Sequence, residues 1–149
     1  MSSEFQSDLR ELQKDLAGSR EELLHALEPL TNSDLERGRR GGWTIGQVLG
    51  HVIQSEYLYG GVVAAIVGAS SGSPLGERPT SIDAARQQLA TTRQHLLTAL
   101  APATEDNFYR LQRFGHDEYS VISVLENAAN HDREHAEQIR RTLAVSSAG

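Results

Sequence analysis

A long run near the C-terminus, residues 120–143, contains neither glycine nor proline and therefore favours one continuous helix. Its apolar or small residues recur at helical spacing: Val121, Val124, Leu125, Ala128, Ile139 and Leu143. His131 and His135 are four residues apart in this run, so they share one face, which continues the apolar stripe. Two inward imidazoles one turn apart can bind one metal ion. The same spacing also occurs by chance, with one histidine hydrogen-bonded and the other solvated.

Three further segments predict helices. Residues 4–27 carry leucines at approximately helical spacing and end before Pro29. A second helix begins at Thr44, which forms a capping box with Gln47, and runs to about residue 67. A third helix extends from a cap at residue 80 or 81 to residue 100, before Pro102. The pattern contains no convincing strand alternation, so we predict an all-α four-helix bundle.

The segments between the helices differ in length and composition. Residues 31–36 could add one turn capped by Asn32 or Ser33, and residues 68–79 form a loop rich in glycine, serine and proline. Residues 103–119 read as a connection with a short extended or turn segment around Gly115. The fourth helix is expected to begin at a Ser120 cap and to end in a basic turn, residues 140–141, before a small-residue tail. Two long connections allow a crossover in the bundle.

Composition excludes several classes of protein. A chain of 149 residues suits one domain, 1–149, with a core over about 4–144. The net charge of −6 argues against nucleic acid as a partner, and no apolar run approaches the length of a membrane span. The absence of cysteine removes disulfides, thiolate ligands and cysteine nucleophiles. The N-terminus does not resemble a signal peptide, so a cytoplasmic protein is expected.

His51 is the candidate third ligand. It lies on an apolar stripe of the second helix, three residues after Val48 and seven before Leu58. The cores of helical bundles bring side chains of facing helices together, so His51 could meet His131 and His135. Three imidazoles favour Zn²⁺, Ni²⁺, Cu²⁺ or Fe²⁺ and leave a coordination position open for a reacting water.

Two stretches resemble the signatures of the DinB/YfiT-like metalloprotein superfamily. Residues 43–52, Trp-Thr-Ile-Gly-Gln-Val-Leu-Gly-His-Val, resemble the first signature. Residues 131–140, His-Asp-Arg-Glu-His-Ala-Glu-Gln-Ile-Arg, resemble the second. The resemblance covers about residues 5–144. It implies a four-helix bundle with a long crossing, often dimeric, and a divalent metal, commonly Zn²⁺ or Ni²⁺, held by His51, His131 and His135.

The resemblance also implies a range of functions. Members of the superfamily include isomerases and S-transferases that use a low-molecular-weight thiol such as mycothiol or bacillithiol, and some hydrolases. The prediction is therefore a metal-dependent S-transferase or hydrolase acting on a small electrophilic molecule, with a metal-bound thiol or water as the reacting group. A non-catalytic, stress-associated metal-binding module is the alternative, and a plain bundle with structural histidines is a third possibility.

Other residues carry weaker expectations. Glu56 lies about 140° around its helix from His51 and could accept a hydrogen bond from a metal ligand or act as a general base, although a surface or interhelical salt bridge is the simpler interpretation. Asp132 is expected to point away from the histidine face, because it is next in sequence to His131, so it is not expected to be a ligand but could support a neighbouring helix. Trp43 is expected to anchor the second helix in the core, and His95 is expected on the surface.

Overall fold

The computed structural model describes residues 3–70 and 78–148. Its elements, in chain order, are α1 (Ser3–Leu27), the 3-10 helix η1 (Asn32–Glu36), α2 (Ile45–Val67), α3 (Ile82–Leu100), α4 (Glu105–Phe108), β1 (Gln112–Phe114), β2 (Asp117–Tyr119) and α5 (Val121–Ala148). The four long helices confirm the predicted all-α bundle.

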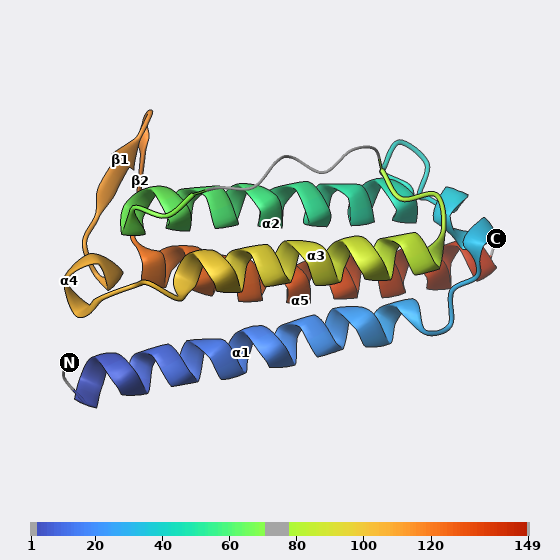
Figure 1. Cartoon of the computed structure of the whole chain (residues 1–149). Helices are drawn as coiled ribbons and strands as arrows, with labels where there is room; N and C mark the ends of the chain where they lie inside the picture. The colour runs from blue at the N-terminus through green and yellow to red at the C-terminus, as the bar shows by residue number, and fades with distance from the viewer. Residues whose placement is uncertain (1–2, 71–77, 149) are drawn as a thin grey trace.

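The four long helices lie alongside one another, with α1 and α5 running in one direction and α2 and α3 in the other (Figure 1). Helix α2 packs against both α3 and α5, and α1 packs against α5. Because α3 starts at the same end of the bundle as α2, the connection between them has to span the length of the molecule (Figure 1). The bundle therefore has the long crossover that the sequence allowed.

Side-chain caps fix where the helices begin. The Thr44 hydroxyl accepts a hydrogen bond from the Gln47 backbone N–H (3.1 Å), and the Gln47 side chain accepts one from the Thr44 N–H (2.8 Å). This is the predicted capping box, and it sets the start of α2. The predicted Ser81 cap is also formed, since its hydroxyl accepts from the Ala84 N–H at 3.0 Å. Ser120 caps α5 through the Ser123 N–H (3.1 Å).

Two local expectations were wrong and a third was confirmed in part. The cap of η1 is Thr31, because Asn32 instead accepts a hydrogen bond from the Ile82 N–H at the start of α3 (2.9 Å). Helix α5 continues to Ala148, so the two arginines at 140–141 do not form its last turn. The connection after α3 forms the short extended segment and turn expected around Gly115, as an antiparallel hairpin of β1 and β2 with Gly115 at φ 67°, but it also contains the short helix α4, which was not predicted.

The core consists of two apolar clusters, one toward each end of the bundle. One cluster includes Leu23, Leu27, Ile45, Leu49, Ile53, Leu89 and Ile139. The other includes Phe5, Leu16, Val63, Leu96, Phe108, Val121 and Leu125. Between them, at mid-length, each long helix contributes one buried or nearly buried charged residue: Arg20, Glu56, Arg93 and Asp132.

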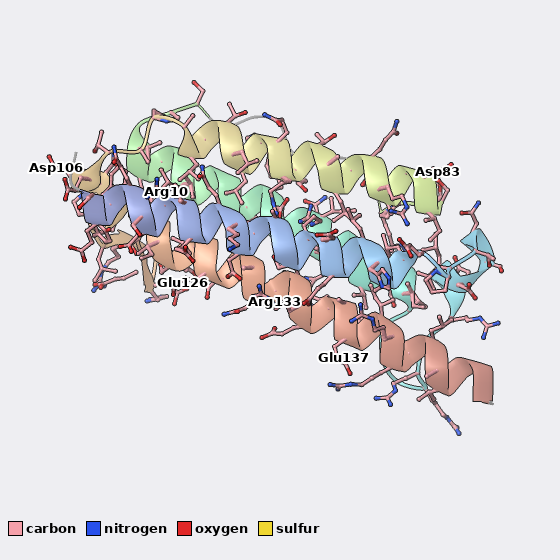
Figure 2. All side chains as sticks on the ribbon, turned by 90° about the horizontal axis from the view of Figure 1, so that it is seen from below. Arg10, Asp83, Asp106, Glu126, Arg133 and Glu137 are labelled. Atoms are coloured by element: carbon pink, nitrogen blue, oxygen red, sulfur yellow. The ribbon has the colours of Figure 1, made fainter. Side chains whose placement is uncertain are left out.

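Most other charged side chains lie outside the bundle. Seen from below, Arg10, Glu126 and Glu137 point outward from their helices, and all three are exposed (Figure 2). Within the part of the chain that the structure describes, no helix combines the length and the apolar character that crossing a membrane requires.

Candidate metal centre

Three histidines from two helices meet at mid-length in the bundle. The Nε2 atom of His131 lies 3.0 Å from Nε2 of His51 and 3.0 Å from Nε2 of His135. All three nitrogens lie within 4.8 Å of one another, and all three side chains are half-buried. The three residues that the sequence proposed as ligands are therefore brought together, on facing helices as expected.

The hydrogen bond of His135 determines which of its nitrogens can bind a metal. Its Nδ1 lies 2.6 Å from the side-chain oxygen of Gln138, one turn further along α5. An amide oxygen can only accept, so Nδ1 carries the proton and donates it. In the neutral ring, Nε2 is then unprotonated, and this nitrogen lies 3.0 Å from Nε2 of His131.

The donor set fits a divalent cation. One proton on His131 Nε2 could satisfy only one of its two close nitrogen neighbours, so three facing imidazoles cannot all be paired with one another. Tetrahedral coordination with Zn–N bonds of the usual length places ligand nitrogens about 3.3 Å apart, close to the observed 3.0 Å separations. His51, His131 and His135 could thus hold a metal ion.

Burial favours the neutral form that metal binding needs in two of the three histidines, His51 and His131. Burial, followed by the neighbouring His135 and His51, lowers the pKa of His131 to about 4, although Glu56 opposes the shift. Burial and His135 likewise lower the pKa of His51. Protons therefore compete poorly for these lone pairs near neutral pH.

Two aromatic residues flank the triad. The ring centroids of Trp43 and His51 are 5.0 Å apart, and those of Tyr59 and His131 are 5.9 Å apart. The expected core position of Trp43 is wrong, because its side chain is 46% exposed. The residue before the Thr44 cap lies outside the helix, so its side chain covers His51 instead of entering the core. Burial raises the pKa of the Tyr59 phenol, with nearby Tyr119 and acidic residues adding to the effect.

Next to the triad is a buried network of two arginines and two carboxylates. Arg20 pairs with Glu56 (2.5 Å) and Asp132 (3.0 Å), and Arg93 pairs with the same two carboxylates (2.9 and 3.0 Å). Thr92 donates a further hydrogen bond to Glu56 at 3.0 Å. Burial opposes the positive charge of Arg20, but Glu56 and Asp132 outweigh it and raise its pKa.

This network shows what Glu56 and Asp132 contact in the folded chain. Glu56 forms the interhelical salt bridge that was the simpler interpretation of this residue. Its side chain is buried and does not lie on the surface. Asp132 points away from the histidine face, as expected, and it is fully buried toward the core, where it pairs with Arg20 and Arg93 on neighbouring helices. Successive residues of a helix are rotated by about 100° around its axis. Asp132 therefore faces the interior of the bundle, whereas His131 lies at the edge of the interior.

The remaining histidines lie away from the triad. His95 is not the surface residue predicted: it stacks on Tyr57 (centroids 5.0 Å apart), and its Nε2 is buried without a hydrogen-bond partner among the described residues. His116 is exposed in the hairpin turn, and His25 is exposed near Glu28.

The sequence analysis assigned no role near the site to Gln138, Arg20 or Arg93. Gln138 is three residues after His135, which puts both on one helix face, so the spacing carried a signal. The arginines interrupt apolar stripes: Arg20 follows Leu16 by four residues, and Arg93 follows Leu89 by four. A charged residue at a core position signals a buried partner, because an unpaired buried charge is costly.

The fold and the site together define a class: helical-bundle proteins with a three-histidine cluster that could hold a metal ion. The model of the DinB superfamily matches residues 9–139, and the chain belongs to that superfamily. The resemblance seen in the two sequence signatures is thereby confirmed.

Solved structures support the same fold. A DinB-like protein from Bacillus cereus ATCC 10987 superposes with a TM-score of 0.73 at 18% identity, covering 91% of each chain. TT2238, described as a four-helix bundle protein, gives a TM-score of 0.68 at 23% identity, covering 88% of this chain and 96% of its own. The search of curated proteins found no match.

Proposed function

We propose that this protein is a divalent-metal-dependent enzyme that activates a low-molecular-weight thiol for transfer to a small electrophile. The observation that carries the proposal is the convergence of the His51, His131 and His135 Nε2 atoms. Three protein ligands leave a coordination position open, which is typical of reactive centres and not of closed structural ones. When bound there, Zn²⁺ or Ni²⁺ would supply a Lewis acid that lowers the pKa of a thiol.

The residues around the triad favour a thiol over water as the reacting group. A hydrolase of this kind commonly uses a carboxylate as general base. The two buried carboxylates nearby, Glu56 and Asp132, each contact both Arg20 and Arg93. The oxygens of both carboxylates are already engaged by the arginines and by Thr92, so neither carboxylate is free to take a proton from a bound water. We therefore propose a positioning role for Glu56, and hydrolysis is the second candidate because water could take the same open position.

The test is turnover by the full chain loaded with Zn²⁺ or Ni²⁺. Conjugation of bacillithiol, mycothiol or glutathione to chlorodinitrobenzene and to monochlorobimane would be measured beside hydrolysis of 4-nitrophenyl acetate. We expect metal-dependent conjugation that is lost in His51→Ala and kept in His116→Ala, the matched change at an exposed histidine. Ester hydrolysis with the same dependence would favour the hydrolase. Neither reaction above the His51→Ala level would favour the alternative, a non-catalytic metal-binding module.

A further inference from the structure

A cavity of about 380 Å³ opens beside the triad, between α2 and the segment that leads into α3. The His51 ring forms part of its wall, and so does the exposed side of Trp43. Ile53 and Pro79 add apolar surface. A volume of this size suits a small organic molecule, which would lie against one of the three candidate metal ligands.

The polar lining of this cavity is suited to an anion. Among the residues that the structure describes (3–70 and 78–148), Arg78 is the only charged one that lines the cavity and no carboxylate lines it, although the chain as a whole carries a net charge of −6. Gly50 makes room for the arginine, since a Cβ at that position would lie 3.1 Å from Arg78 Cγ. Gln47 already uses its side-chain oxygen in the α2 cap, so the group that it has left to offer is the NH₂ donor.

One acceptor in the cavity wall lacks a partner. The side-chain oxygen of Gln88 on α3 is buried and receives no hydrogen bond from any of the described residues. Buried polar atoms in folded proteins are nearly always paired, because leaving one unpaired costs free energy. A ligand that carries an N–H or O–H group near its anionic end would supply the missing donor.

We propose that this cavity binds a small organic carboxylate, with its charge on Arg78 and its apolar body between Trp43 and Ile53. Gln47 would add a hydrogen bond to the carboxylate, and Gln88 would accept one from the ligand. The identification of this carboxylate as the electrophilic substrate rests on the proposed function, whereas its binding does not require the metal. Arg78 is then a specificity-determining residue for a reaction at the neighbouring triad.

Trp43 is the only tryptophan in the chain, so its fluorescence reports on this cavity. The full-length protein would be titrated with benzoate, phenylacetate and hexanoate, and with benzamide as the uncharged counterpart of benzoate. We expect a saturable change with at least one carboxylate and far weaker binding of benzamide. Arg78→Gln should weaken carboxylate binding by about tenfold or more, because a charge-assisted hydrogen bond is lost. Gln88→Glu should weaken it as well, by repulsion.

Two controls distinguish binding through Arg78 from binding through the metal or through an arginine outside the cavity. Arg86→Gln removes a charge from α3 outside the cavity and should leave binding unchanged. The titration is repeated on a His131→Ala, His135→Ala variant, where binding that still depends on Arg78 supports the proposal whether or not the enzyme turns over. Absence of a saturable response to all three carboxylates would overturn it. So would binding that needs the metal and ignores Arg78→Gln, since the metal would then be holding the carboxylate.

Discussion

At the scale of single residues, the hydrogen bond between His135 and Gln138 decides which ring nitrogen faces the other two histidines. The 2.6 Å contact holds the ring in one tautomer and one orientation. Gln138→Leu removes the acceptor, so we expect the affinity for Zn²⁺ to fall about 10- to 100-fold. Competition with a chelating dye measures this affinity. Gln94→Leu, a change at an exposed glutamine of α3, is the matched control. If Gln138→Leu and Gln94→Leu bound Zn²⁺ with equal affinity, the contact with Gln138 would not orient the His135 ring for metal binding.

The lowered pKa of His131 makes a prediction about pH. Its pKa is about 4 in the folded chain and about 6.5 in an unfolded one, so the unfolded state binds the proton first as the pH falls. The metal-free protein should therefore lose stability between about pH 6.5 and pH 4, and keep that stability above this window. Urea unfolding across the range should show a flatter dependence for His131→Asn. His116→Asn, in the exposed hairpin turn, should follow the wild type; equal slopes in all three proteins would contradict the account.

The four-residue interval placed His131 and His135 on one helix face, and the apolar stripe of α2 made His51 the candidate third ligand. The resemblance to the DinB superfamily implied the same three residues. The position of Trp43 could not be predicted in the same way. It precedes the Thr44 cap, where the chain has no helical periodicity, and its contact with His51 depends on how the preceding loop folds back. Residues that act through tertiary contacts, such as Arg78, have no local pattern at all.

At the scale of the elements, close packing of α2 against α3 depends on a glycine. A Cβ on Gly60 would lie 2.6 Å from Cδ2 of His95, which is itself stacked on Tyr57. Gly60→Ala should lower the free energy of unfolding by about 1–3 kcal/mol through overpacking. Gly18→Ala is the same change inside α1, where a Cβ meets nothing within 4 Å, and should raise stability by about 1 kcal/mol. Chemical denaturation measures both, and effects of the same sign would contradict the packing account.

Helix boundaries were predictable where a cap or a breaker marks them. Thr44 and Ser81 start α2 and α3 as expected, and α1 ends before Pro29. The C-terminal end of α5 was misjudged, because a basic pair is compatible with any position on an exposed face. The short hairpin was only partly foreseen, since strands of three residues such as β1 are too brief to show an alternating pattern.

At the scale of the whole molecule, the four-charge network connects all four long helices between the two apolar clusters. Arg20→Met leaves Glu56 and Asp132 to share one arginine and should cost about 3–5 kcal/mol of stability. Arg133→Met breaks an ion pair with Asp15 at the surface and should cost about 1 kcal/mol or less. Urea unfolding compares the two variants. Equal losses would mean that the buried network contributes no more than a surface pair.

The all-α bundle followed from four periodic segments, and the crossover followed from the length of the connection after α2. What the sequence could not supply was the pairing of the charges, because each partner lies on a different helix. Arg20 and Asp132 are far apart in the chain and meet only when α1 packs against α5. Each could be recognised as a charge on an apolar stripe, but its partner could not be named.

The account depends most directly on metal binding by the triad. Elemental analysis of the purified, untagged protein would be made beside a His131→Ala, His135→Ala variant. We expect about one Zn²⁺ or Ni²⁺ per chain in the wild type and none in the variant, as three convergent imidazoles require. Absence of stoichiometric metal from the wild type, even after incubation with Zn²⁺ and Ni²⁺, would contradict the central claim and leave a helical bundle whose histidines are structural.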